Sequence, residues 1–488
     1  MSLAIVDVDR FITNATLRMP FSFGNVTVTE QPQLFVRIEL DHPDGRTRGV
    51  ASDGLSPRWF QKDLGYEEGL AAMLEVIDRA CGLATRVGSG ATPFAIWQAV
   101  YDRQASWGRE SPHPPLLWAY GVSLVERALI DAYCRARDRP FAALLREGGF
   151  GLDLAAFHHE LAGTSPPDHL PARSPDRVAV RHTIGLTDPL TAEDLDVESR
   201  VSDGLPQTLV EHVRTHGVQY FKVKLAGDGH EDLARLEWIA TVLDQCPIEE
   251  YRLTLDANEQ YASAEAFRAF WDRLREASVW HKLADRILFV EQPLPRHAAF
   301  GVETRSAFRA WPDKPPIVID ESDDRLDSCA TALACGYDGT SHKNVKGVFK
   351  GVANACRIRQ LQAEQPDASY RMSWEDAANV GPVALLQDLA VGSTLGIDHV
   401  ERNGHQYFRG LTMMPDSIQE RVLASHDDLY ERHENGFPTV RITDGELRFG
   451  SVADAPFGYD VDLELSELSL LESWIEEHEL PEDRSAGG

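Results

Sequence analysis

The sequence is short of cysteine, of basic residues and of long apolar runs, and each shortage argues against a class of protein. Its six cysteines are scattered over 488 residues without CxxC spacing, so neither a zinc cluster nor a disulfide framework is indicated. The formal net charge of −29 disfavours nucleic-acid binding through a basic surface. No stretch resembles a membrane span, so we expect no membrane partner.

The N-terminal residues MSLAIVDVDRF lack a basic segment followed by an apolar run, so we expect no secretion and a cytoplasmic location. A composition of 43% hydrophobic and 26% charged residues is ordinary for a globular enzyme. The length predicts two or three folding units.

Residues 1–150 are predicted to form an α+β unit. Strand-like alternation runs from Leu3 to His42, and helical periodicity follows, most strongly over 119–137. Residues 151–176 are rich in Gly, Pro and His and are predicted to be a linker or insertion. His158 and His159 lie there, but adjacent histidines point in different directions on regular structure, which disfavours a shared metal.

Residues 177–410 alternate between strand and helix patterns, with eight predicted strands. A parallel (β/α) barrel is the leading interpretation, and an open doubly wound sheet is the alternative. No GxGxxG or GxxxxGK[ST] follows the first strand to support a nucleotide site. Residues 411–488 return to short strand-like pieces and end in PEDRSAGG, which we expect to be frayed.

Charged residues end four successive predicted strands of this barrel. The segments are FKVKL with Lys222 and Lys224, LTLDAN with Asp256, ILFVEQP with Glu291 and PIVIDES with Asp320. They are spaced roughly 30 residues apart, about the length of one strand-plus-helix unit. Because the carboxyl ends of barrel strands meet at one mouth, we expect these side chains to converge.

The two lysines, Lys222 and Lys224, are two positions apart and therefore share a face of their strand. Their mutual repulsion would lower the pKa of at least one lysine, which suits a general base near neutral pH. The alternative is that they are ordinary ion-paired lysines.

Three carboxylates from consecutive strands could hold a hard divalent cation such as Mg²⁺. A single acid at a strand end is more often a helix cap or an ion-pair partner, but three in succession favour a metal site. Lys343, in TSHKNVKG, would approach from the opposite side of the barrel. Lys346 is interpreted as a supporting or surface group.

The segments KVK, LDANEQY, VEQP, IDES and HKNVKG together resemble the enolase superfamily, in particular its muconate lactonizing enzyme subgroup. The resemblance implies a modified TIM barrel, (β/α)7β, with an α+β capping domain built from the N-terminal region and the C-terminal segment. It also implies Mg²⁺ ligands Asp256, Glu291 and Asp320, with Glu321 competing for the third place. Lys224 then resembles the base of the KxK motif, and Lys343 the opposing acid/base.

The activity implied by this resemblance is removal of the proton α to a substrate carboxylate through an ene-diolate. A lysine on each side resembles racemases and epimerases, cycloisomerases and o-succinylbenzoate synthases, which are isomerases or lyases. A sugar-acid dehydratase and a catalytically silent relative are the alternatives. A barrel metallohydrolase is disfavoured because no HxH follows the first strand.

The expected partner is a small-molecule carboxylate, and family members commonly form homo-oligomers. Phe23, Asn258 and Trp374 are the predicted substrate-binding residues, and Trp59, Phe60, Glu375 and Asp398 are further candidates for the pocket wall. The segment SWEDAANVG departs from the family pattern, and DHVERNGHQYF lacks the paired aspartates expected of dipeptide epimerases. The substrate therefore stays open.

Overall fold

The centre of the molecule is a closed barrel of eight parallel strands, seen in a computed structural model that describes residues 2–478. The tail that we expected to be frayed lies outside these residues. The last barrel strand pairs with the first and closes the barrel. The strands are β6 (Arg177–Ile184), β7 (Tyr220–Lys224), β8 (Arg252–Asp256), β9 (Ile287–Glu291), β10 (Ile317–Ile319), β11 (Gly339–His342), β12 (Arg371–Trp374) and β13 (His399–Arg402).

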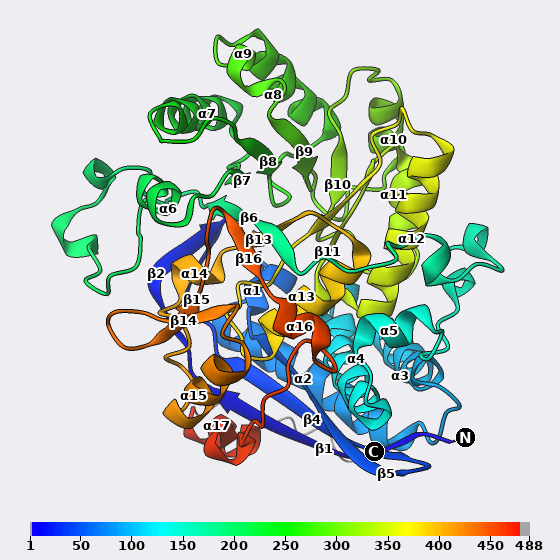
Figure 1. Ribbon diagram of the computed structural model, residues 1–488. Coiled ribbons are helices and arrows are strands. Elements are labelled where there is room, and N and C mark those ends of the chain that lie inside the picture. Colours follow the sequence, from blue (N-terminus) through cyan, green and yellow to red (C-terminus); the bar gives the residue numbers. More distant parts are fainter. Residues whose placement is uncertain (1, 479–488) are drawn as a thin grey trace.

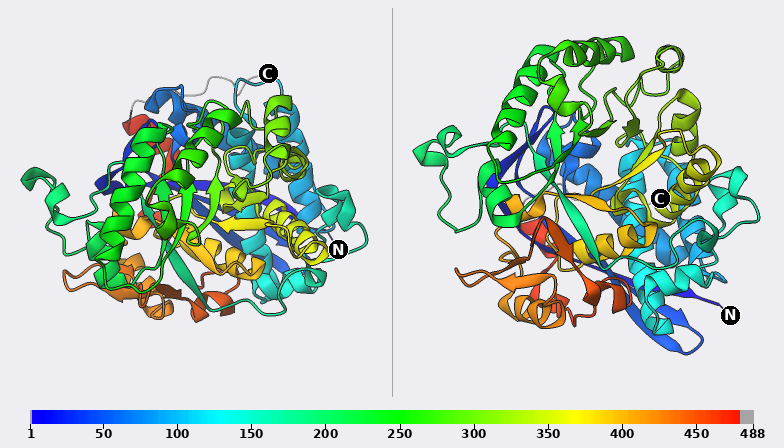
Figure 2. Two further views of the ribbon diagram at one scale, coloured as in Figure 1. Left: turned by 90° about the horizontal axis from the view of Figure 1, so that it is seen from above. Right: turned by 45° about the horizontal axis from the view of Figure 1, so that its top comes forward.

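Each of the seven connections between these strands contains a helix, so the predicted (β/α)7β barrel is confirmed. Figures 1 and 2 show these helices, coloured green to yellow, on the outside of the strands. They are α6 (Leu209–His216), α7 (Gly229–Asp244), α8 (Ala264–Glu276) followed by the short α9 (Trp280–Leu283), α10 (Val302–Arg309), α11 (Ser328–Cys335), α12 (Val348–Glu364) and α13 (Ala384–Leu395).

Local sequence signals explain where these helices begin and end. Thr208 and Glu211 form a reciprocal capping box at the start of α6, and the Ser263 side chain caps α8. Gly396, with φ of +72°, ends α13 in the left-handed conformation that glycine adopts without a steric penalty. The chain can therefore reverse directly into the last barrel strand.

The N-terminal residues form an antiparallel sheet and a hairpin, followed by helices. The sheet order is β17-β1-β4-β5, and β2 pairs with β3. The strands are β1 (Ala4–Thr13), β2 (Thr16–Phe23), β3 (Val26–Glu30), β4 (Gln33–His42) and β5 (Gly45–Gly54), and the helices are α1 (Pro57–Phe60), α2 (Tyr66–Arg86), α3 (Pro93–Gly108), α4 (Pro115–Arg137) and α5 (Phe141–Arg146).

Helix α4 packs directly on strand β5 of this sheet. At Gly49 an added Cβ would lie 2.2 Å from the backbone nitrogen of Ala132 in α4, so only glycine permits the close approach. The predicted α+β cap is confirmed as an architecture.

The C-terminal residues return to both the barrel and the N-terminal sheet. Strand β16 pairs antiparallel with β6, and β17 pairs with β1 through Phe11 and Leu470. In Figure 1 the red helix α17 lies beside the blue strands accordingly. The elements are α14 (Gly404–Tyr407), α15 (Asp416–Ser425), β14 (Tyr430–Arg432), β15 (Pro438–Val440), β16 (Glu446–Arg448), α16 (Gly450–Asp454), β17 (Ser469–Leu470) and α17 (Leu471–Glu477).

The stretch 151–176 contains three single-turn 3₁₀ helices. His158 is buried and pairs through Nε2 with Asn354 Oδ1 at 2.8 Å, whereas the neighbouring His159 is exposed. The two side chains point apart, as strand or helix geometry predicts.

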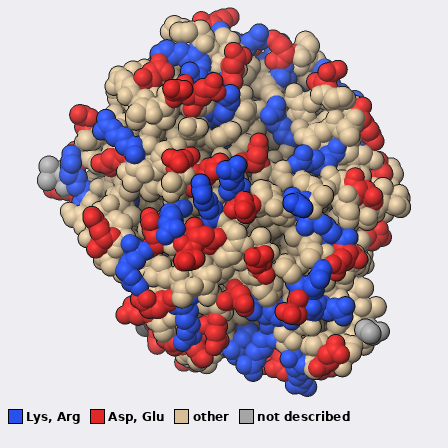
Figure 3. Space-filling view, viewed as in Figure 1, with Lys and Arg blue, Asp and Glu red and all other residues tan. Residues whose placement is uncertain are grey.

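Acidic and basic side chains are interspersed on the face shown in Figure 3. Among the helices of residues 2–478, none combines the length and apolarity needed to cross a bilayer.

Candidate active site

The charged residues at the strand ends lie in register across the barrel. Lys224 pairs with Asp256, and Asp256 with Glu291, as Cα partners on β7, β8 and β9. Glu291 in turn pairs with Val318, which places Asp320 two residues beyond this level. The parallel register therefore gathers these side chains at one mouth of the barrel.

Lys222 lies at the centre of this group and is almost completely buried. Its ammonium nitrogen is 2.8 Å from Glu401, 2.9 Å from Glu291, 3.0 Å from Glu375 and 3.0 Å from Asp256. Burial alone would lower the pKa of Lys222, but the surrounding carboxylates raise it well above its ordinary value. The expected lowering of the pKa by repulsion between the two strand lysines is therefore wrong for Lys222, since its nearest charges are negative.

The other two candidate lysines each donate to a carboxylate of the same group. Lys224 Nζ is 2.6 Å from Asp256 Oδ2. Lys343 Nζ is 2.6 Å from Asp320 Oδ2 and 2.7 Å from Glu375 Oε2. Burial opposes the charge on Lys343, but these carboxylates raise its pKa well above the ordinary value. The two lysines enter from the second and sixth barrel strands, on opposite sides of the mouth.

Three carboxylates have oxygens close enough to share one metal ion. One oxygen each from Glu291, Asp320 and Glu375 lies within 4.8 Å of the others, and all three side chains are buried. Glu291 Oε2 accepts no hydrogen bond within residues 2–478, although Lys222 Nζ lies 2.9 Å away. The Lys222 ammonium already offsets part of the negative charge on this oxygen. This all-oxygen donor set fits a hard divalent cation such as Mg²⁺.

This oxygen set differs by one residue from the predicted ligand set. Asp256 is not among the three residues whose oxygens lie within 4.8 Å of one another. Its Oδ2 accepts from Lys224, and its Oδ1 accepts from the backbone N–H of Asn258 at 2.9 Å. Glu375 takes the third position from the end of β12. The segment SWEDAANVG contains Glu375, but spacing along the sequence did not show whether Glu375 or its neighbour Trp374 faces the mouth of the barrel.

Asp320 is closer to the group than its neighbour Glu321. Asp320 Oδ1 accepts from Ser341 Oγ at 2.6 Å and from Lys346 Nζ at 3.1 Å. Glu321 instead accepts from Asn258 Nδ2 at 3.0 Å, and burial together with the charge of Asp320 raises the pKa of Glu321 to about 7. Lys346 is buried here as an ion-pair partner of Asp320, and a surface position for it is excluded.

A cavity above these charges is closed by aromatic residues of the N-terminal region. The Lys224 ammonium lies 5.8 Å from the centre of the Phe23 ring, and the Lys343 ammonium lies 5.2 Å from that of Trp59. The barrel side of the cavity is polar and includes Asn258. The apolar wall is formed by Leu17, Phe21, Phe23, Val28, Trp59, Phe60 and Tyr120.

Trp374 does not line this cavity, contrary to our expectation. It is fully buried, and its indole packs against Gly392 of α13, on the outside of the barrel. Strand alternation explains the difference, because Trp374 and Glu375 are adjacent and point to opposite sides. Asp398 is exposed and is not a cavity residue either.

Gly392→Ala should test how closely Trp374 packs against helix α13. An added Cβ would lie 1.8 Å from the Trp374 ring, so we expect a loss of about 1–3 kcal/mol in the free energy of unfolding. Urea denaturation would measure it, with Gly229→Ala as the control, since a Cβ there meets its nearest neighbour at 3.5 Å. Equal losses in the two variants would contradict the expected overpacking.

Two further polar residues inside the barrel, Arg181 and Thr183, were missed in the sequence analysis. Arg181 Nη2 donates to Glu375 Oε1 at 3.1 Å, and Thr183 Oγ1 donates to Glu401 Oε1 at 2.7 Å. Arg181 and Thr183 alternate along β6, in VAVRHTI, so the period-two pattern already placed them on one face. Only the pairing of β6 with β13, which closes the barrel, shows that this face of β6 points inward.

Two further buried carboxylates, Asp376 at the cavity and Asp388, should make stability depend on pH. Arg402 Nη1 lies 2.9 Å from Asp376 and 3.6 Å from Asp388, so one cation serves two acids. Burial, despite the attraction of Arg402, raises the pKa of Asp388 from 3.8 to about 6. The folded state therefore binds the proton of the Asp388 carboxyl more tightly than the unfolded state does. The stability that this protonation contributes is complete below pH 3.8 and is lost as pH rises through 6.

Asp388→Asn should therefore remove part of the pH dependence of unfolding. The pKa shift of Asp388 from 3.8 to about 6 corresponds to at most about 3 kcal/mol of stability, present at low pH and lost at neutral pH. Urea denaturation of both proteins between roughly pH 4 and pH 7 should show the wild-type protein losing more stability than the variant as pH rises. Parallel curves would mean that Asp388 is ionised throughout this range.

No protein-family model and no curated protein sequence matches this chain. Solved structures do match it in fold. An N-succinyl Arg/Lys racemase from Bacillus cereus is 15% identical, with a TM-score of 0.59 over 96% of this chain and 98% of its own. A muconate lactonizing enzyme from Pseudomonas fluorescens is 18% identical, with a TM-score of 0.57 over 97% and 98%.

A dipeptide epimerase from Enterococcus faecalis, solved with Mg and the dipeptide L-Leu-L-Tyr, is 15% identical, with a TM-score of 0.54 over 84% of this chain and 92% of its own. At such identities the likeness concerns the fold. The chain has the capped, modified TIM-barrel fold of the mandelate racemase and muconate lactonizing enzyme structures.

Proposed function

We propose that this chain is an Mg²⁺-dependent enzyme of the enolase superfamily that removes the proton α to the carboxylate of a small-molecule acid. One observation carries the proposal. Two lysines, Lys224 and Lys343, reach the same cavity from opposite sides of the barrel, above a buried group of carboxylates. The fold shared with racemases, an epimerase and muconate lactonizing enzymes supports this reaction type.

The proposed metal ligands are Glu291, Asp320 and Glu375, with Asp256 able to join if it releases Lys224. The Mg in the dipeptide epimerase structure supports the choice of ion. When bound, Mg²⁺ supplies Lewis-acid stabilisation of the negative charge that develops on the substrate carboxylate. The protein must supply the remaining functions, which are proton transfer, orientation and exclusion of water.

Lys224 is the proposed base and Lys343 the proposed acid. Lys224 Nζ has one carboxylate partner, Asp256, whereas Lys343 Nζ has two, Asp320 and Glu375. The raised pKa of Lys343 keeps its proton available for delivery. Removal on one side and delivery on the other would invert the α-carbon, which favours a racemase or epimerase within the lysine-lysine group.

The apolar wall narrows the proposed substrate class. The Phe21 and Phe23 rings pack with their centres 5.1 Å apart and their planes tilted by 43°, and the Trp59 and Phe60 rings meet edge to face with their centres 4.9 Å apart. These rings would cover an apolar substituent and keep water from the reacting carbon. A sugar acid would leave several hydroxyls facing rings that cannot pair with them, so a dehydratase is the weaker candidate.

We also propose that residues 1–150 and 411–478 act together as the cap over barrel residues 177–410, with 151–176 as an insertion. The cavity wall comes from the first of these segments, and the pairing of β17 with β1 ties the last segment to it.

Deuterium exchange tests the proposal directly. The protein would be incubated in deuterated water with carboxylic acids bearing apolar α- or N-acyl groups, and α-exchange would be followed by NMR. We expect Mg²⁺-dependent exchange for at least one acid. Lys224→Met should abolish the exchange of the enantiomer whose α-proton faces Lys224. Absence of exchange across a broad library, with the protein folded and Mg²⁺ present, would contradict the proposed chemistry.

Metal removal provides a further prediction. Chelation should reduce exchange at least about 100-fold, and added Mg²⁺ should restore it. Glu291→Gln should weaken Mg²⁺ affinity without unfolding the chain, because glutamine keeps the side-chain length. Exchange that persists in the chelated protein would exclude a metal role.

A further inference from the structure

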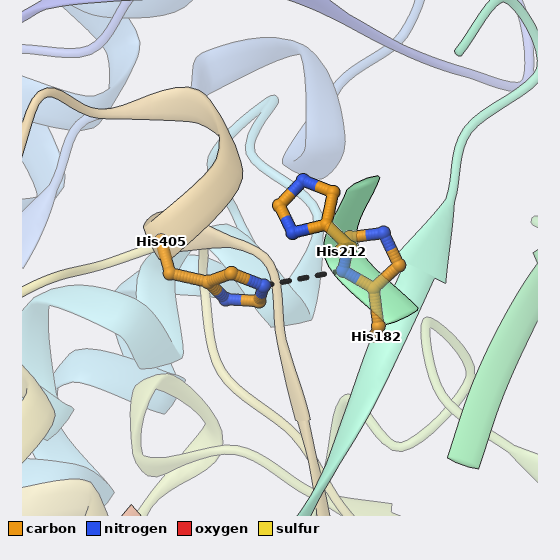
Figure 4. A group of neighbouring side chains, drawn as sticks. All are labelled: His182, His212 and His405. Atoms are coloured by element: carbon orange, nitrogen blue, oxygen red, sulfur yellow. Dashed lines mark hydrogen bonds between the residues drawn. The ribbon is translucent and has the colours of Figure 1, made fainter. Parts of the chain in front are cut away.

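A second cluster of metal-binding side chains lies outside the candidate active site. His182, His212 and His405 come from β6, α6 and α14, and one ring nitrogen of each lies within 4.8 Å of the others. Figure 4 shows the three rings turned toward one another. Alternation along β6 explains the separation from the mouth, because Arg181 and Thr183 point into the barrel and His182 points outward.

The nitrogens are almost at ligand spacing. His182 Nδ1 and His405 Nε2 are joined by a hydrogen bond of 3.2 Å, drawn as a dashed line in Figure 4. Two nitrogens on a tetrahedral Zn²⁺ are separated by about 3.3 Å, so a metal ion would replace this hydrogen bond with little movement of the two rings. The His212 ring lies 4.2 Å from His182 and 5.3 Å from His405 between ring centres. Rotation of this one side chain would complete a three-nitrogen set.

The cluster has unsatisfied polar atoms. Neither ring nitrogen of His212 has a hydrogen-bond partner in the described part of the chain, and neither has His405 Nδ1. His212 is completely buried, and a buried polar group without a partner costs about 1–3 kcal/mol. Packing as ordinary core histidines would leave this cost in place, whereas a metal ion would satisfy one of the two His212 nitrogens.

The charge state also suits a metal. Burial lowers the pKa of His182 to about 3 and that of His212 and His405 well below the ordinary value, with the neighbouring histidines adding to the effect. The rings are thus neutral and have lone pairs available. The nearby Arg18 is paired with Asp203 at 2.5 Å, which balances its charge.

We propose that His182, His212 and His405 form a buried site for Zn²⁺ or a similar imidazole-binding transition metal. Water or His216 would complete the coordination, since the His216 ring lies 5.5 Å from that of His212 and 5.7 Å from that of His405. Three-histidine coordination is a known zinc arrangement, and imidazole also suits Co²⁺. The site joins the first barrel strand to the first crossover helix and to the segment after the last strand, so its role is to lock the closure of the barrel.

The test uses the full chain, purified after expression in zinc-supplemented medium and again after chelation, with excess Mg²⁺ present to occupy the oxygen site. We expect one Zn²⁺ per chain by elemental analysis. Co²⁺ substitution should give the intense visible bands of a four-coordinate site. Full occupancy should raise the thermal unfolding midpoint.

His212→Gln and His405→Gln should each weaken Zn²⁺ binding by about 100-fold or more, while the exposed His159→Gln and the mouth variant Glu291→Gln should keep it. If a histidine variant does not fold by circular dichroism, the cobalt spectrum of the wild-type chain decides, because six-coordinate oxygen sites give only weak bands. Absence of zinc from the wild-type chain, a six-coordinate cobalt spectrum, or unchanged zinc in both folded variants would each overturn the proposal.

Discussion

Lys222→Met is expected to lower the free energy of unfolding by about 3–5 kcal/mol when divalent metal is absent, because it leaves a buried group of carboxylates without its central cation. Lys222 Nζ contacts four carboxylates within 3.0 Å, and its side chain is only 1% exposed. Urea denaturation in chelator would measure the loss.

The same variant should respond more strongly to Mg²⁺ than the wild-type chain. Removing one positive charge makes the oxygens of Glu291 and Glu375 better ligands, and a ligand that binds only the folded state stabilises it. Lys282→Met is the matched control, since Lys282 pairs with Asp244 at the surface, where an ion pair contributes about 0–1 kcal/mol. If both variants lose the same stability, Lys222 is not the central charge of the barrel mouth.

Lys343→Met and Lys224→Met are expected to produce the largest losses of activity. Removing a positioned acid or base should lower the rate by about 10²–10⁴-fold. The two losses should differ in kind. In Lys343→Met, Lys224 should still exchange the α-hydrogen on its own side, but inversion should stop. In Lys224→Met, exchange should stop for the enantiomer whose α-proton faces Lys224.

Chiral chromatography combined with NMR of each enantiomer in deuterated water would separate these outcomes. Lys282→Met again serves as the control and should retain full activity. Equal loss of exchange for both enantiomers in both variants would contradict the division of roles and would point to a general disturbance of the carboxylate group.

Much of the fold could be read from the sequence because its signals are local. The period of about 30 residues between FKVKL, LTLDAN, ILFVEQP and PIVIDES reflects one strand and one helix per unit. The convergence of Lys224, Asp256 and Glu291 followed from the same pattern, since parallel strands in register bring their carboxyl ends to one level.

The environment of each charge could not be read in this way. Two lysines two residues apart predicted mutual repulsion, yet Lys222 is surrounded by acids from four other strands. The sign of a pKa shift depends on the nearest charges and on burial, and both are set by distant parts of the chain.

The sequence by itself determined the alternation of strand and helix, the barrel with its cap, and the positions that end each strand, because these depend on periodicity and spacing along the chain. Only the tertiary structure decided that Glu375 and not Trp374 faces the mouth, that Lys222 is the central cation, and that three histidines from distant segments meet behind β6. The physical reason is the same in each case. Closure of the barrel decides which side chains from distant segments are buried against one another, and no local sequence pattern contains that information.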